Sequence, residues 1–180
     1  MKNPNVAVVG YGFAGRCFHT YLVGLATELN LYGIATSRAE ARAQIQQQLD
    51  VKTFSCFEDI LDDPQVDLVV LATPNDLHAP HAIRALEAGK HVVTDKPMCL
   101  DVAEADAMIA ASHKTNRLLS VFQNRRWDGD FLTVRSVVEE GLLGNLLQIE
   151  MAWMGYSRPR TWRSENQRGG GKFVDLGAHM

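Results

Sequence analysis

The stretch NVAVVGYGFAGRCFHTYLVGL, residues 5–25, decides how this chain is expected to fold. Its first six residues are a short apolar run that ends in glycine, which predicts a buried strand. Gly10, Gly12 and Gly15 then form the pattern G-x-G-x-x-G. Such glycines permit a tight turn, close approach of the backbone to a pyrophosphate, and close packing of the next helix, whose N-terminus attracts phosphate. The stretch therefore predicts a dinucleotide-binding turn, with a plain glycine-rich turn as the alternative.

The residues on either side of this turn extend the pattern. Apolar side chains recur at steps of three and four, which predicts a helix with one apolar face: Ala14, Phe18, Tyr21, Leu25 and Leu29. Further along we expect strands at residues 31–36, 53–54, 67–72, 91–94 and 118–122, and helices at residues 39–49, 57–61, 77–88 and 101–113. Strands that alternate with helices over short connections predict an α/β fold, with a doubly wound parallel sheet of the Rossmann type.

The pattern changes near residue 124, where we place a domain boundary. A helix is expected at residues 128–140, and apolar and other residues then alternate over residues 147–153. Alternation of this kind predicts a strand with one buried face, typical of an antiparallel sheet. One strand cannot form a sheet. We therefore expect residues 1–124 to be a dinucleotide-binding domain and residues 125–180 to begin a second domain of a longer polypeptide, the 180 residues alone being inactive.

Chemically unusual residues follow five of the predicted strands. In an open α/β sheet, ligands bind outside the carboxyl ends of the strands. Five separate placements at one edge predict a cofactor site there. The candidate contacts are Gly10, Gly12, Phe13, Ala14, Gly15, Ser37, Arg38, Thr73, Pro74, Asn75, His78, Asp95, Lys96, Pro97, Gln123 and Arg125.

The end of the second strand bears on the choice of cofactor. An NAD site places Asp or Glu about 20 residues after the glycines, where it accepts from the ribose 2′-hydroxyl. This chain has Ser37 and Arg38 there, and no carboxylate before Glu40. Arginine pairs well with a 2′-phosphate, and a serine hydroxyl can donate to it. NADP is therefore predicted, while NAD remains possible if Arg38 is only a solvated residue at the start of a helix.

Three residues are candidates for proton transfer. Lys96, at the sheet edge near a nicotinamide, could hold a substrate hydroxyl, although a surface lysine in a turn is the alternative. Asp175 and His179 are four residues apart and share one face if this segment is helical. A histidine steered by a carboxylate is a proton shuttle, but such a pair can also be a structural hydrogen bond. No third ligand is evident, so no metal site is predicted.

These residues together resemble the Gfo/Idh/MocA family, named after glucose–fructose oxidoreductase, inositol dehydrogenase and a rhizopine catabolism protein. The most specific stretches are ATPNDLHAPHAIRALEAGKHVVTDKP, residues 72–97, and GGGKFVDLGAHM, residues 169–180. The resemblance implies a Rossmann domain followed by an α/β domain whose open antiparallel sheet commonly serves oligomerisation. The full-length protein is accordingly expected to be a homo-oligomer.

The same resemblance implies roles for individual residues. Lys96 matches the lysine of the family motif E-K-P, with Asp95 in place of glutamate, and the peptide bond before Pro97 is expected to be cis. Asp175 and His179 match the family motif D-x-x-x-H. The implied reaction is hydride transfer between a nicotinamide and a carbinol carbon of a sugar, cyclitol or related diol. A non-catalytic dinucleotide-binding regulator of the same family is the alternative.

Composition excludes several other classes of protein. The net charge of -3 leaves no basic excess for nucleic acid. No apolar run approaches the roughly 18 residues of a membrane span, and the N-terminus has no secretory pattern, so a cytoplasmic protein is expected. Cys17, Cys56 and Cys99 fit no disulfide or metal pattern.

Overall fold

The computed structural model describes residues 2–155, 165 and 168–179. Its centre is a six-stranded sheet with the order β3-β2-β1-β4-β5-β6, in which every neighbouring pair is parallel. The strands are β1 (Asn5–Val9), β2 (Asn30–Ala35), β3 (Lys52–Phe54), β4 (Leu68–Leu71), β5 (His91–Thr94) and β6 (Leu119–Val121). This is the doubly wound Rossmann arrangement that the sequence predicts.

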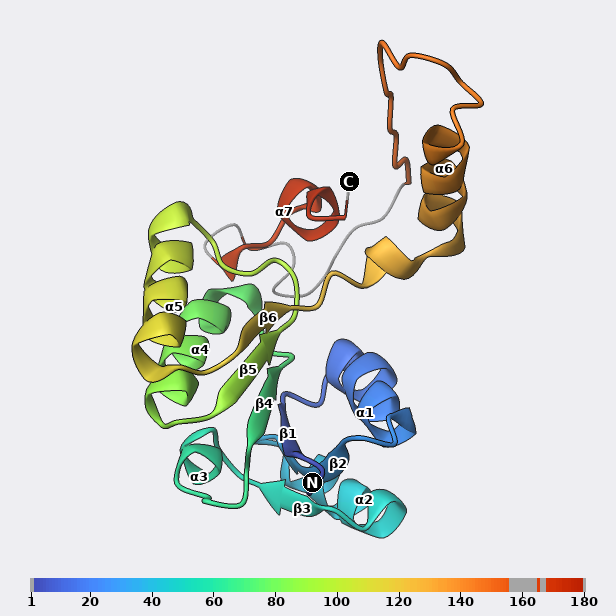
Figure 1. Ribbon diagram of the computed structural model, residues 1–180. Helices are drawn as coiled ribbons and strands as arrows, with labels where there is room; N and C mark the ends of the chain where they lie inside the picture. The colour runs from blue at the N-terminus through green and yellow to red at the C-terminus, as the bar shows by residue number, and fades with distance from the viewer. Residues whose placement is uncertain (1, 156–164, 166–167, 180) are drawn as a thin grey trace.

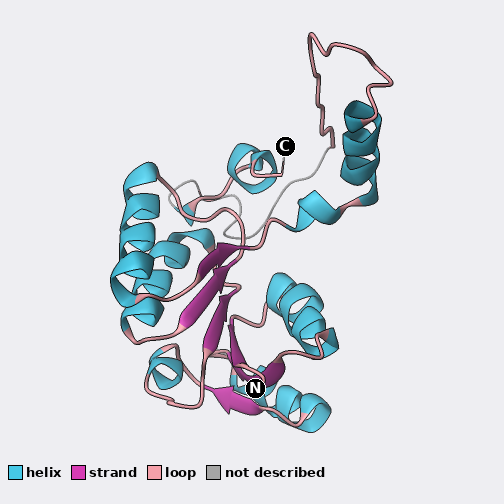
Figure 2. Cartoon of the chain, in the orientation of Figure 1, coloured by secondary structure: helices cyan, strands magenta, loops and turns pink. Residues whose placement is uncertain are grey.

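Helices cover both faces of this sheet (Figures 1 and 2). They are η1 (Gly15–Thr20), which continues as α1 (Tyr21–Leu25), then α2 (Ala39–Leu49), α3 (Glu58–Leu61), η2 (Asn75–Leu77), α4 (His78–Glu87), α5 (Val102–Thr115), η3 (Asn124–Trp127), α6 (Gly129–Glu139) and α7 (Lys172–Gly177). The strands and helices predicted up to residue 140 are present, with bounds that differ by at most two residues, apart from the helix after the glycine turn.

The core has two halves because strand β1 is buried on both faces. Ala7 and Val9 pack on the side covered by α4 and α5, whereas Val6 and Val8 pack on the side of α1 and α2. Successive side chains of a strand point to opposite faces, so an uninterrupted apolar run is what a central parallel strand requires. The strand order reverses between β1 and β4. Loops that leave their carboxyl ends diverge there and open a crevice.

The predicted apolar face of the helix after the glycine turn is wrong. The helix ends at Leu25, so Leu29 lies outside it, and the side chains of Phe18, Tyr21 and Leu25 are exposed. The buried positions are Gly15, His19, Thr20 and Val23. Gly15 must face the sheet, because a Cβ there would lie 1.9 Å from the Gly10 carbonyl oxygen. That contact, together with the π-helical winding of residues 15–20, rotates the helix about its axis so that Gly15 faces the sheet and the side chains of Phe18, Tyr21 and Leu25 face outward.

The strand predicted at residues 147–153 is also wrong. The segment is irregular and its side chains are exposed, with Leu147 97% accessible. Figure 1 shows it beyond α6, away from the sheet. A strand needs a hydrogen-bonded neighbour, and no described residue pairs with this segment. Among the described residues, no helix is both long enough and apolar enough to cross a membrane.

Candidate active site

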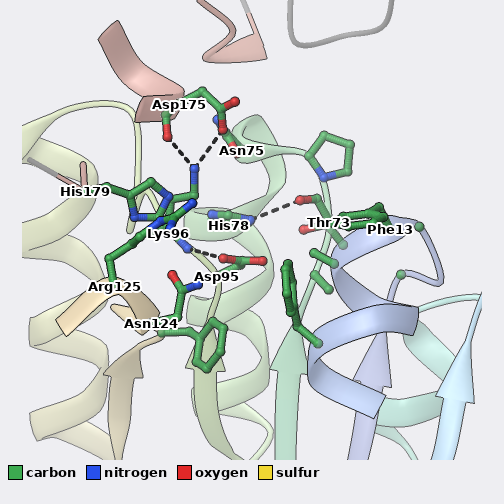
Figure 3. A pocket seen from close by; sticks show the side chains of 17 residues that line it. Phe13, Thr73, Asn75, His78, Asp95, Lys96, Asn124, Arg125, Asp175 and His179 are labelled. Atoms are coloured by element: carbon green, nitrogen blue, oxygen red, sulfur yellow. Dashed lines mark hydrogen bonds and ion pairs between the residues drawn. The ribbon is translucent and has the colours of Figure 1, made fainter. Parts of the chain in front are cut away.

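A cavity of about 520 Å³ lies at the carboxyl ends of β1, β4 and β5 (Figure 3). Five segments that are far apart in the sequence contribute to it: the glycine turn, the loops after β4, β5 and β6, and helix α7 with the residues that follow it. Of the predicted site residues it brings together Gly10, Gly12, Phe13, Ala14, Thr73, Pro74, Asn75, His78, Asp95, Lys96, Arg125, Asp175 and His179. Gly15, Ser37, Arg38, Pro97 and Gln123 do not line it.

The glycine turn presents bare backbone to this cavity. Gly10 has φ +96°, and a Cβ on it would lie 2.5 Å from the carbonyl oxygen of Ala72. At Gly12, in contrast, a Cβ would meet no atom within 4 Å. Gly10 and Gly15 therefore let the turn pack against its neighbours, while Gly12 leaves open space beside the backbone. This geometry fits a pyrophosphate, which needs close approach to main-chain N–H groups.

The loop after β4 contributes an unpartnered hydroxyl group to the cavity and a hydrogen bond to the segment before α7. The Thr73 hydroxyl is buried and has no hydrogen-bond partner among the described residues, so it is available to a bound molecule. Asn75 is buried, and its side-chain nitrogen donates to the carbonyl oxygen of Gly169 at 2.8 Å. The Arg168 guanidinium lies 3.2 Å from the Asp76 carboxylate. These two contacts dock the segment before α7 on the Rossmann domain.

Lys96 and Asp175 form the central ion pair of the site (Figure 3). The Lys96 ammonium lies 2.8 Å from Asp175 Oδ1, and it also donates to the Asp175 backbone carbonyl oxygen. The two side chains are only 15% and 30% exposed, so solvent screens the pair less than it would screen a surface salt bridge. The Lys96–Pro97 peptide bond is cis, as the family resemblance implies.

His179 is an imidazole held in its neutral form. Burial, and after it the positive charges of Lys96 and Arg125, hold its pKa below the ordinary value, against the opposing effect of Asp175. Its Nδ1 atom is buried and has no hydrogen-bond partner among the described residues. The centroid of the His179 ring lies 6.4 Å from that of the Trp153 ring. The Arg125 guanidinium lies over the Trp153 ring, 4.8 Å from its centroid. A neutral imidazole with a free nitrogen can accept a proton.

Asp95 is ionised inside the site. Burial alone would raise its pKa, but hydrogen bonds from the buried His19 ring and from the Lys96 N–H outweigh this effect and hold the pKa below its ordinary range. The His19 Nε2 to Asp95 Oδ2 distance is 3.2 Å, and the Lys96 N to Asp95 Oδ1 distance is 2.7 Å. The carboxylate is therefore committed to two protein donors.

Two arginines gather at the end of β2, outside the cavity. Arg38 donates from Nη2 to the carbonyl oxygen of Tyr11 in the glycine turn at 2.6 Å. Arg42, one helical turn later, donates from Nη1 to the carbonyl oxygen of Thr36 at 2.7 Å. Both guanidinium groups thus lie where the sequence analysis expects the 2′-phosphate end of the cofactor. Arg42 was missed, although its i, i+4 spacing from Arg38 at the start of α2 was a signal.

The cavity also contains residues that the sequence analysis did not assign to it. Asn124 lies within the polar run after β6, so its position could have been included. Phe18 and Phe122 gave no polar signal, since aromatic residues beside a sheet are usually core. No group of three or more potential metal ligands is found in the described part of the chain.

Comparison with known proteins agrees with this geometry. The family description "Oxidoreductase family, NAD-binding Rossmann fold" matches residues 4–123, and "GFO/IDH/MocA C-terminal domain" matches residues 131–180. The chain is 38% identical to the uncharacterized oxidoreductase YdgJ of Escherichia coli over 99% of its own length and 51% of that protein. It is 35% identical to scyllo-inositol 2-dehydrogenase (NADP(+)) IolW of Bacillus subtilis, over 97% of this chain and 49% of that protein.

A solved structure gives the same result. The NAD-binding protein from Listeria innocua superposes with a TM-score of 0.93 at 37% identity, over 99% of this chain and 52% of that one. This chain thus spans about half the length of the curated relatives that it matches. The Rossmann sheet, the glycine turn and these matches together lead to one conclusion: the chain belongs to the GFO/IDH/MocA family of oxidoreductases, with the NAD-binding Rossmann fold of that family.

Proposed function

We propose that the protein is an NADP-dependent oxidoreductase that acts on a carbinol carbon of a sugar, cyclitol or related diol. The observation that carries the proposal is the meeting of Lys96, Asp175 and His179 in one cavity whose floor is the glycine turn. When bound, the nicotinamide supplies the hydride acceptor or donor, while position and proton transfer fall to the protein. Open backbone at Gly12 and the unpartnered Thr73 hydroxyl are the groups that would hold the cofactor.

Lys96 is suited to stabilise negative charge on the substrate oxygen. An ammonium group has three hydrogens, and two of the three are directed at the side chain and the backbone of Asp175. The third is available to a substrate hydroxyl. Because the ion pair is partly buried, the orientation of Lys96 is set before substrate arrives, as electrostatic stabilisation of a developing alkoxide requires.

His179 is the better proton acceptor of the two candidates. The Lys96 ammonium has no lone pair to accept a proton, whereas the imidazole has a lowered pKa and an unpartnered Nδ1. In the oxidation direction His179 would take the hydroxyl proton, and in the reduction direction it would return it. The sequence alone leaves this assignment open between the two residues, and the geometry favours the histidine.

Preference for NADP rests on the two arginines at the end of β2. Arg38 and Arg42 place two guanidinium groups there, beside Ser37 and with no carboxylate before Glu40. A guanidinium pairs with a phosphate dianion through charge-assisted hydrogen bonds. The relative IolW is named scyllo-inositol 2-dehydrogenase (NADP(+)), which supports both the cofactor and a polyhydroxylated substrate.

The experiment that tests the proposal uses the full-length protein. Calorimetric titration with NADP and with NAD measures the cofactor preference, and a spectrophotometric screen of cyclitols, sugars and polyols measures NADPH formation. We expect tighter binding of NADP than of NAD, and turnover of at least one polyhydroxylated substrate. Absence of binding to either nucleotide would overturn the proposal. Cofactor binding without turnover of any substrate would favour a regulator instead.

A further inference from the structure

The turn at residues 95–97, called the Lys96 turn here, is held from both sides by buried histidines. Asp95 precedes the lysine and contacts His19, while Pro97 follows it and contacts His78. His19 is 4% exposed and His78 is fully buried. Neither imidazole has a part in the chemistry proposed above. Burying a polar ring is costly unless the ring is hydrogen-bonded, so the hydrogen bonds of these two histidines need an explanation.

The first contact joins the Lys96 turn to the helix that follows the glycine turn. His19 lies in η1, packs against the ring of Phe122 at a centroid distance of 4.6 Å, and donates from Nε2 to Asp95 Oδ2 at 3.2 Å. The other oxygen of the same carboxylate accepts the backbone N–H of Lys96 at 2.7 Å. One carboxylate therefore links His19 to the main chain of the lysine.

The second contact joins the Lys96 turn to the loop after β4. His78 Nδ1 lies 2.7 Å from the carbonyl oxygen of Pro97, and Nε2 lies 3.1 Å from the carbonyl oxygen of Thr73. A carbonyl oxygen only accepts hydrogen bonds, and a neutral imidazole has one N–H. The contact at Nδ1 is the shorter of the two, and its partner Pro97 is the residue next to Lys96.

We propose that His19 and His78 are positioning residues, which hold the main chain of Lys96 so that its ammonium group reaches Asp175 and the substrate oxygen. The proposal rests on the proposed function. Lysine has a long side chain with many rotamers, so the site of its reactive nitrogen depends on a fixed backbone. His78 itself lines the cofactor cavity, and His19 directly follows Phe18, which also lines it. The two cofactor loops and the Lys96 turn are thereby connected as one unit.

Amide variants separate the two ring nitrogens. The side-chain nitrogen of asparagine lies where histidine has Nδ1, and that of glutamine reaches where histidine has Nε2. His19→Gln thus keeps a donor for Asp95, whereas His19→Asn does not. His78→Asn keeps a donor for Pro97, whereas His78→Gln keeps only the contact with Thr73. Each pair alters the same buried site by similar polar groups and differs in the contact that matters.

The expected result is an asymmetry within each pair. In the full-length protein, kcat of His19→Asn falls below that of His19→Gln, and kcat of His78→Gln falls below that of His78→Asn. The difference should be about tenfold to a hundredfold, because a small displacement of a reacting group costs that much. The dissociation constant of NADP, measured by calorimetry, should be the same for His19→Asn and His19→Gln. Hydrogen exchange of the Lys96 amide should be faster in His19→Asn than in His19→Gln.

His81 provides the matched control. It lies on α4, one turn after His78, and stacks on Phe57 at a centroid distance of 4.2 Å, outside the cavity. His81→Asn and His81→Gln should show equal kcat. If kcat fell equally in both members of the His19 pair and in both members of the His78 pair, the role of the histidines would be purely structural and the proposal would be overturned. This holds whether or not circular dichroism shows unfolding. If the unaltered protein binds no nucleotide, the proposed function fails, while amide exchange still decides whether His19 holds the turn.

Discussion

The Lys96 ammonium lies 2.8 Å from the Asp175 carboxylate, although 79 residues separate them in the sequence. The pair joins the loop after β5 to helix α7, so two segments of the chain complete one site. Because both side chains are mostly buried, solvent screens the attraction between their charges only weakly. The first prediction follows from this pair. Lys96→Ala should lower kcat by about 10²–10⁴-fold, the usual contribution of a group that stabilises or transfers charge at the reacting atom.

Steady-state kinetics on the full-length protein, with NADP binding measured separately, checks this prediction. Lys52→Ala is a control, because Lys52 pairs with Asp63 at 2.6 Å, far from the cavity. A Lys96→Ala variant that kept its kcat and changed only KM would remove the lysine from the chemistry.

The second prediction concerns the pH dependence of the reaction. Burial and the cations Lys96 and Arg125 lower the pKa of His179 from its ordinary value of 6.5. A proton acceptor fails as the pH drops through its pKa, so the acid limb of activity in the oxidation direction should have its midpoint below the ordinary pKa of histidine. Arg125→Met removes one of the cations and should move this decline to higher pH. The measurement is kcat/KM against pH.

Arg126→Met is the control for Arg125→Met, because Arg126 lies on the same short helix but faces the ring of Phe131 at 5.9 Å. It should leave the acid limb in place. An acid limb that does not move in Arg125→Met would contradict the electrostatic account of His179. Because Lys96, Asp175 and His179 interact, the measured pKa belongs to the group of three rather than to one residue.

The third prediction concerns cofactor choice. Arg38→Ala and Arg42→Ala should each weaken NADP binding by roughly tenfold to a hundredfold, the value of a charge-assisted hydrogen bond, and should leave NAD binding nearly unchanged. Arg84→Ala is the control, because Arg84 on α4 pairs with Glu58 on α3 at 2.9 Å and neither residue lines the cavity. Calorimetry with both nucleotides is the measurement. A preference for NADP that survived both substitutions would refute these roles.

The fourth prediction separates two glycines of one motif. Gly15→Ala places a Cβ 1.9 Å from the Gly10 carbonyl oxygen, so it should lower the free energy of unfolding by about 1–3 kcal/mol or more. Gly12→Ala meets no atom within 4 Å and should leave stability nearly unchanged while it weakens cofactor binding. Thermal unfolding and calorimetry distinguish the two effects. Equal destabilisation by both substitutions would show that Gly12 does not face open space.

The sheet could be predicted from the sequence because burial on two faces leaves a plain signal. Val6 to Val9 form an apolar run that only a central strand or a buried helix tolerates, and the glycines that follow exclude the helix. The helix after them misled the prediction because Phe18 and Tyr21 look like core residues. Its rotation is set instead by the contact between Gly15 and Gly10, which periodicity does not report.

Most residues that line the cavity could be predicted from the sequence, but the contacts between them could not. The end of a strand predicted Lys96, and the i, i+4 spacing together with the family resemblance predicted Asp175 and His179. The pairing of Lys96 with Asp175 depends on where α7 docks, and the contacts that dock it, of Asn75 with Gly169 and of Arg168 with Asp76, leave no periodic signal in the sequence. His19 carried no local signal at all, because its partner Asp95 lies 76 residues away.

The docking of the segment before α7 has a practical consequence for recombining members of this family. Gly169 has φ +70°, and a Cβ there would lie 2.2 Å from Leu100 Cδ2 and 3.0 Å from the Asn75 Cβ. A chimera that imports residues 168–179 from a relative must therefore keep glycine at position 169, because both the left-handed backbone and the close neighbours Leu100 and Asn75 disfavour a side chain there. Crossover points chosen near residue 124 alone would separate Gly169 from Asn75 and Leu100, and the hybrid would lose the docking of α7 beside the Rossmann sheet.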